Sequence, residues 1–146
     1  MRIVKVILSV LSLAIFLLGC DMVPASDVDF AKYVFTRMAK GSLGVEKYIG
    51  WESLKAVGVD VGGTYKKFNE KDKLGYRKAF LKNYSFSFRT AGGSLKYFHN
   101  WRIHSQDSAK TTIAVSTQNL TLLLDISNDS RNKRKLIGMD WLKKDN

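Results

Sequence analysis

Residues 111–126 read TTIAVSTQNLTLLLDI, and this stretch decides the fold class. Ile113 and Val115 alternate with small or polar residues, and a second run of alternate apolar residues extends from Leu120 to Ile126. Apolar side chains at every second position lie on one face of a β-strand. Two such runs with a short connection predict an antiparallel pair of strands.

The same period of two continues on both sides of this pair. Upstream, alternate apolar residues extend from Leu95 to Ile103, with Phe98 as an exception on the polar face. Downstream, Ile137, Met139 and Trp141 follow a cluster of turn-forming residues. Four successive strands with short connections predict an antiparallel meander, whose apolar face needs a cover.

Helices that could supply this cover are predicted in the N-terminal half. Apolar residues recur there at spacings of three, four and seven, which place them on one side of a helix. The first helix is expected from the N-cap Ser26 to Gly41, a shorter one from Ser42 through Leu54, and the third after Asn69. We therefore predict one α+β domain over residues 26–146, with N-terminal helices packed on a curved four-stranded antiparallel sheet.

Composition limits the protein to few classes. The 146 residues suffice for one domain, and 45% of them are hydrophobic, which excludes a disordered or collagen-like chain. The single cysteine excludes a disulfide framework and a Cys-rich zinc site. Lys and Arg number 24 against 13 Asp and Glu, so that the formal net charge is +11.

The first twenty residues, MRIVKVILSVLSLAIFLLGC, indicate export. Arg2 and Lys5 precede an apolar run over residues 6–18, which is shorter than the roughly 20 residues of a spanning helix. Its end, LLGC, resembles the bacterial lipobox, which implies cleavage before Cys20 and attachment of lipid to the Cys20 thiol. Residues 1–19 are then a signal peptide that is removed, and residues 20–25 a lipidated tether.

Two further expectations concern this segment. The alternative to lipidation is an ordinary secretory signal followed by an unrelated cysteine. Asp21 resembles the residue that retains lipoproteins in the inner membrane, facing the periplasm. In an organism with a single membrane the protein would face the outside.

A second resemblance covers residues 27–143. Helices followed by a long antiparallel sheet, with a Trp101-Arg102-Ile103 strand and a terminal strand through Trp141, resemble the NTF2-like (cystatin-like) superfamily. The element order is more distantly similar to periplasmic phospholipid-carrying proteins of the toluene-tolerance type. The resemblance implies an apolar pocket between helices and sheet, for which we single out four residues, Tyr84, Tyr97, His99 and Trp101.

No motif indicates catalysis, a metal or another cofactor. His99 and His104 are five residues apart in one predicted strand, so that they face opposite ways and cannot share a metal ion unless the strand contains a bulge. His99 is expected to line the core as a hydrogen-bonded residue. The sharper alternative makes it an acid or base that pairs with Asp140 or Asp125 in the pocket.

Basic residues cluster before the last predicted strand, at Arg131, Lys133, Arg134 and Lys135. They predict contact with an anionic membrane surface or an acidic envelope partner, or else form a solvated face. An exported protein rarely meets nucleic acid, which we exclude. The sequence thus predicts a non-catalytic binding or interaction module of the cell envelope, with an assembly accessory, or an enzyme that uses His99, as alternatives.

Overall fold

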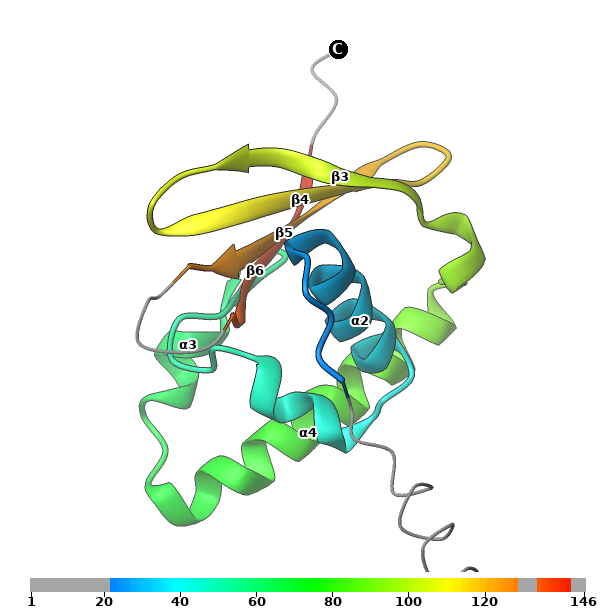
Figure 1. Ribbon diagram of the computed structural model, residues 1–146. Coiled ribbons are helices and arrows are strands. Elements are labelled where there is room, and N and C mark those ends of the chain that lie inside the picture. Colours follow the sequence, from blue (N-terminus) through cyan, green and yellow to red (C-terminus); the bar gives the residue numbers. More distant parts are fainter. Residues whose placement is uncertain (1–21, 129–133, 143–146) are drawn as a thin grey trace, which may run out of the picture.

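A computed structural model describes residues 22–128 and 134–142, in which helices cover one face of a sheet (Figure 1). The predicted α+β class is confirmed. The helical elements are α2 (Asp27–Ala39), η1 (Leu43–Tyr48), α3 (Val61–Tyr65), α4 (Glu70–Thr90) and η2 (Leu95–Tyr97). The strands are β1 (Lys55–Ala56), β2 (Val59–Asp60), β3 (His99–Gln106), β4 (Lys110–Ser116), β5 (Thr121–Ser127) and β6 (Leu136–Leu142).

The predicted meander is present as β3 to β6, each antiparallel to the next. Its register aligns Ile113 with Leu124, and Leu124 with Met139. All three side chains are at most 3% exposed and point to the same side of the sheet, toward the helices. The alternation in the sequence therefore identified the core face of β4 and β5. In β6 the register shifts beside Ile126, so that Leu136 is fully buried although the pattern placed it on the opposite face from Ile137.

The sheet has six strands rather than the predicted four, in the order β2-β1-β6-β5-β4-β3. β1 pairs with β6 in parallel, with Lys55 opposite Gly138, and β2 turns back on β1. An uncovered β6 would expose a row of backbone hydrogen-bonding groups, and this short addition covers part of that edge. The predicted helix from Ser42 through Leu54 is accordingly wrong, because η1 ends at Tyr48 and the chain then extends along β6.

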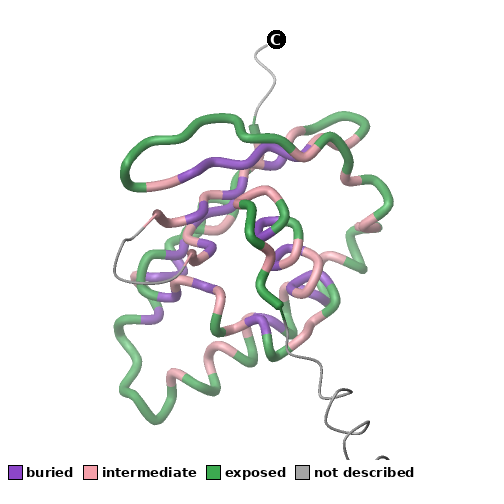
Figure 2. The backbone as a smooth tube through the Cα atoms, viewed as in Figure 1, coloured by how far each residue is buried: buried purple, intermediate pink, exposed green. Residues whose placement is uncertain are grey.

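Helix α2 lies between the sheet and α4 (Figure 1). Its predicted N-cap is confirmed, since the Ser26 hydroxyl oxygen accepts a hydrogen bond from the backbone N–H of Asp29 at 3.0 Å. Phe30, Val34 and Met38 are fully buried. The burial is concentrated in this helix and in the central strands, as Figure 2 shows in purple.

Helix α4 is long but is buried at few points. It begins after its predicted N-cap Asn69 and continues to Thr90. Only Leu81 and Ser85 of its 21 residues are buried. The Ser85 hydroxyl donates a hydrogen bond to the Ala39 carbonyl at 2.8 Å, which fixes α4 across the end of α2.

Candidate functional site

An apolar cavity of about 660 Å³ lies between the C-terminal half of α4, the segment that follows it and the sheet. We call it the apolar cavity. It opens to solvent beside the β4–β5 turn. Its lining residues are Phe35, Val57, Tyr84, Ser87, Phe88, Ala91, Gly92, Gly93, Ser94, Tyr97, Phe98, Thr117, Gln118, Asn119, Leu120, Leu122, Met139 and Trp141.

Aromatic rings form one wall of this cavity. The ring centroid of Phe35 on α2 lies 4.8 Å from that of Phe98 and 6.0 Å from that of Phe88 on α4. Tyr97 and Leu120 are respectively 42% and 45% exposed at the mouth. The distances from the Phe35 ring centroid to those of Phe98 and Phe88 are typical of packed aromatic pairs. The wall is therefore preformed, and its apolar surface remains accessible from outside.

The polar groups of the lining are neutral. Among the described residues, the lining contains no Asp, Glu, Lys, Arg or His, and its polar groups are hydroxyl, amide and indole groups and the backbone. Burial raises the pKa of Tyr84 well above its ordinary value, so that its phenol, like that of an ordinary tyrosine, is neutral at neutral pH and stays so into strongly basic solution. A ligand inside this cavity thus meets apolar surface and uncharged hydrogen-bonding groups.

The hairpin between β1 and β2 contributes a strained residue to the wall. Val57 has a φ of 49° and the following Gly58 a φ of 77°, as in the two-residue turns that connect twisted strands. This left-handed conformation is energetically unfavourable for a β-branched residue such as Val57. The Val57 side chain is also 51% exposed. Val57 also lines a second groove of about 420 Å³ along α4, which shares Tyr84 and Ser87 with the apolar cavity.

Of the four predicted pocket residues, Tyr84 and Tyr97 line the apolar cavity, whereas His99 and Trp101 do not. The prediction that His99 and Trp101 share a face fails because β3 is irregular between them. Asn100 has a φ of 54°, and the pairing with β4 shifts between His99 and Arg102. The regular alternation on which the prediction rested is therefore interrupted at Asn100.

This irregularity separates the two side chains. Trp101 packs against Phe35, with ring centroids 5.9 Å apart, and its buried indole nitrogen has no hydrogen-bond partner among the described residues. His99 is exposed, and its Nδ1 lies 3.0 Å from the Tyr97 carbonyl oxygen. The expectation that His99 lines the core is thus wrong.

The two aspartates considered as partners of His99 lie on the other face of the sheet. Asp125 accepts hydrogen bonds from Lys110 at 2.7 Å and Thr112 at 2.6 Å, and Asp140 is exposed. Both line a polar hollow of about 570 Å³ together with His104. No group of three metal-ligating side chains occurs within residues 22–128 and 134–142.

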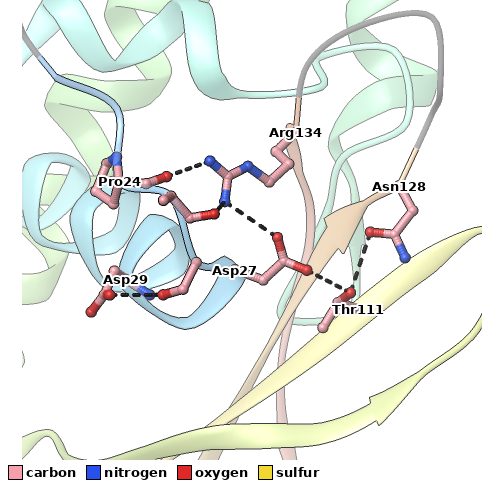
Figure 3. Close-up of polar contacts among 8 residues, drawn as sticks. Pro24, Asp27, Asp29, Thr111, Asn128 and Arg134 are labelled. Atoms are coloured by element: carbon pink, nitrogen blue, oxygen red, sulfur yellow. Dashed lines mark hydrogen bonds and ion pairs between the residues drawn. The ribbon is translucent and has the colours of Figure 1, made fainter.

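The cluster predicted to contact an anionic surface is divided by the structure. Arg131 and Lys133 lie outside the described residues. The Arg134 guanidinium donates to the carbonyls of Pro24 and, at 2.7 Å, Ala25, and lies 3.4 Å from an Asp27 carboxylate oxygen (Figure 3). Arg134 is thus engaged within the chain, and its contact with an anionic surface stays a prediction.

We call this arrangement the Arg134 clamp and define it as Arg134 with Pro24, Ala25 and Asp27. Phe30 and Thr111 contact the clamp. The guanidinium carbon also lies 5.0 Å from the centre of the Phe30 ring. Asp27 accepts a hydrogen bond from the buried Thr111 hydroxyl at 2.8 Å. Lys135 donates to the Lys47 carbonyl, so that it too is engaged within the domain.

Cys20 and Asp21 lie outside the described residues, so lipid attachment and membrane retention stay predictions. Within the described part of the chain, no helix has the length and apolar character needed to cross a bilayer.

Most residues of the cavity wall were not predicted from the sequence. Phe98 was singled out only as an exception to the alternation, and it lines the cavity because η2 replaces the start of the predicted strand. Phe88 and Trp141 were visible as apolar residues, but nothing in their spacing indicated an unfilled space.

Comparisons with protein-family models, with curated proteins and with solved structures found no match to this chain.

Proposed function

We propose that this chain is a bacterial lipoprotein, tethered through Cys20, whose domain is a non-catalytic binding module of the cell envelope. Its apolar cavity would hold a lipid or a small apolar ligand. The observation that carries the proposal is an accessible cavity of about 660 Å³ to whose lining the described part of the chain contributes no charged side chain. This volume falls within the roughly 300–1,000 Å³ of pockets that bind small molecules.

The arrangement also supports an NTF2-like domain as our structural proposal. Helices precede a long antiparallel meander, and an apolar cavity lies between the two, as that resemblance implies. The parallel β1 at the sheet edge is a departure from the expected pattern. The enzymatic alternative requires His99 in the cavity, and His99 is not among its lining residues.

The tether is tested by Cys20→Ser in the full-length protein. Thioether formation needs the Cys20 sulfur, and we place the lipidated protein in the inner membrane because of Asp21. Metabolic labelling with a radioactive fatty acid should label the wild type and leave the variant unlabelled. Label that persists in the variant would contradict the lipobox assignment.

The cavity is tested by filling it. Ser87 on α4 is exposed and lines both the apolar cavity and the adjoining groove, so that Ser87→Trp introduces an indole without displacing a buried side chain. Native mass spectrometry of the full-length protein should show a co-purified apolar compound in the wild type and at least about tenfold less of it in the variant.

Thr90→Trp is the matched control. Thr90 is also an exposed hydroxyl residue of α4, but it does not line the cavity or the groove. The control should retain the compound at the wild-type level. Equal retention in all three proteins would show that the compound binds elsewhere, and a wild type that carries and takes up no apolar compound would favour the assembly-accessory alternative.

A further inference from the structure

A second hollow adjoins the apolar cavity and has the opposite character. It measures about 450 Å³ and lies where the end of α2, the end of α4 and η2 meet. Lys40, Arg89 and Lys96 all line it, and no Asp or Glu within residues 22–128 and 134–142 does. We call it the cationic hollow, defined by these three side chains.

The cationic hollow and the apolar cavity share part of their walls. Phe88, Gly93 and Ser94 line both, so that one aromatic side chain and two small residues separate them. Gly93 packs closely, since a Cβ there would lie 2.5 Å from the Phe88 carbonyl oxygen. The cationic hollow and the apolar cavity therefore lie on two sides of one closely packed turn of the chain.

The three cations are available for an outside anion. All three residues are exposed, and none forms an ion pair with a carboxylate among residues 22–128 and 134–142. Arg89 donates through Nε to the Ser85 carbonyl at 3.3 Å, which orients its guanidinium, and the Lys96 ammonium lies 5.2 Å from the Tyr97 ring centre. Tyr97 itself lies at the mouth of the apolar cavity.

Helix dipoles explain only part of this arrangement. Lys40 and Arg89 stand at the C-terminal ends of α2 and α4, where a cation is favoured. Lys96 lies on η2, which has three residues and offers little comparable field. The convergence of the three at one hollow beside an apolar cavity therefore needs a further reason.

We propose that the ligand is an amphiphile with one anionic head group, a carboxylate or a phosphate, and an acyl chain. The cationic hollow binds the head group through charge-assisted hydrogen bonds, and the apolar cavity takes the chain. This inference rests on the proposed function, and it names the class of ligand for the same site.

The test compares an acid with its neutral ester. The full-length protein, in nanodiscs of phosphatidylcholine, is titrated with 11-(dansylamino)undecanoic acid and with the methyl ester of that acid. Energy transfer from tryptophan reports binding, since Trp141 lines the cavity. The acid should bind about tenfold more tightly than the ester, the effect of one charge-assisted contact.

The triple variant Lys40→Gln, Arg89→Gln, Lys96→Gln should bind the acid as weakly as the ester, while its affinity for the ester stays at the wild-type value. The matched control removes the same charge from exposed residues elsewhere, in the triple variant Lys67→Gln, Lys71→Gln, Lys78→Gln. It should preserve the preference for the acid. Loss of the preference in the control would show a general charge effect and overturn the proposal.

Competition distinguishes the head groups and the sources of the anion. Displacement of the acid probe by palmitate or by lysophosphatidic acid, with monoacylglycerol weaker, supports the proposal and separates a carboxylate from a phosphate head. Displacement by inorganic phosphate alone would show a plain anion site and overturn it. Equal binding of acid and ester to the wild type overturns the inference but not the proposed function, whereas binding of neither overturns both.

Discussion

The guanidinium of Arg134 joins the residues that follow Cys20 to the start of β6. It contacts two successive backbone carbonyls and the Asp27 carboxylate, which in turn accepts from Thr111 on β4. Such a planar group with several fixed donors suits several acceptors at once. The contacts attach Pro24 and Ala25, the last two residues of the predicted tether, to the domain.

We expect Arg134→Lys to lower the free energy of unfolding by about 1–2 kcal/mol, because a single ammonium cannot replace all of these contacts. Urea unfolding of the full-length protein, followed by circular dichroism, provides the measurement. Arg102→Lys is the control, since Arg102 is exposed on β3 and should change stability by less than about 0.5 kcal/mol. Similar losses in both variants would contradict the importance of the Arg134 clamp.

Single residues also decided where prediction from the sequence failed at the site. Tyr84 and Tyr97 both line the apolar cavity, but only Tyr84 does so from the predicted element, a helix whose spacing indicated its inner side. Tyr97 lies on η2, where the alternation predicted a strand. His99 was misplaced because Asn100 adopts a positive φ, which an alternating pattern does not reveal. Asparagine is among the residues that tolerate this conformation, so its presence mid-strand was the available signal.

At the scale of elements, the β1–β2 hairpin is the least predictable part. Each of its strands has two residues, which is too short for a periodic pattern, and its partner β6 lies some eighty positions further along the chain. The caps of α2 and α4, by contrast, followed from Ser26 and Asn69. Helix caps can be predicted because their hydrogen bonds join neighbouring residues. The pairing of a short strand with a sheet edge that is distant in the sequence cannot be predicted in this way.

The same hairpin supplies a prediction about strain. Val57→Asn should raise the free energy of unfolding by about 1 kcal/mol, because Asn followed by Gly favours this turn and a β-branched residue does not. It should also weaken retention of the dansyl ester probe, since the Val57 side chain lines the apolar cavity.

Val59→Asn serves as the control for Val57→Asn. Val59 is also exposed in the hairpin, but it is not among the residues with a positive φ. Its replacement should not stabilise the protein, because asparagine is disfavoured in a strand. Urea denaturation measures both variants, and a Val57→Asn protein no more stable than the wild type would show that the turn carries no strain that asparagine relieves.

Across the whole molecule, the two longest helices differ in burial, since α2 is largely buried and α4 is mostly exposed. Helix α2 packs between the sheet and α4 with most of its inner side chains buried, whereas α4 has two buried residues (Figures 1 and 2). The α+β class and the meander were predicted because patterning reports which faces are apolar. The cavity was expected only from a family resemblance, since patterning does not report whether an apolar face is filled by its neighbour.

This division predicts the order of amide hydrogen exchange in the full-length protein. Local stability follows burial, so amides of β4 and β5 should exchange slowest, through global unfolding. Amides of residues 70–79 in α4 should exchange much sooner, because both buried residues of this helix, Leu81 and Ser85, lie beyond them.

Binding of 11-(dansylamino)undecanoic acid should then change exchange selectively. Protection should increase over residues 84–98, which contribute to both the apolar cavity and the cationic hollow. It should stay unchanged in β2, which follows the β1–β2 turn, and in the first turns of α4. Mass spectrometry of peptic fragments resolves these segments. If α4 is as protected as β4 without the probe, the helix closes on the sheet in solution, and the cavity on which the binding function depends is absent there.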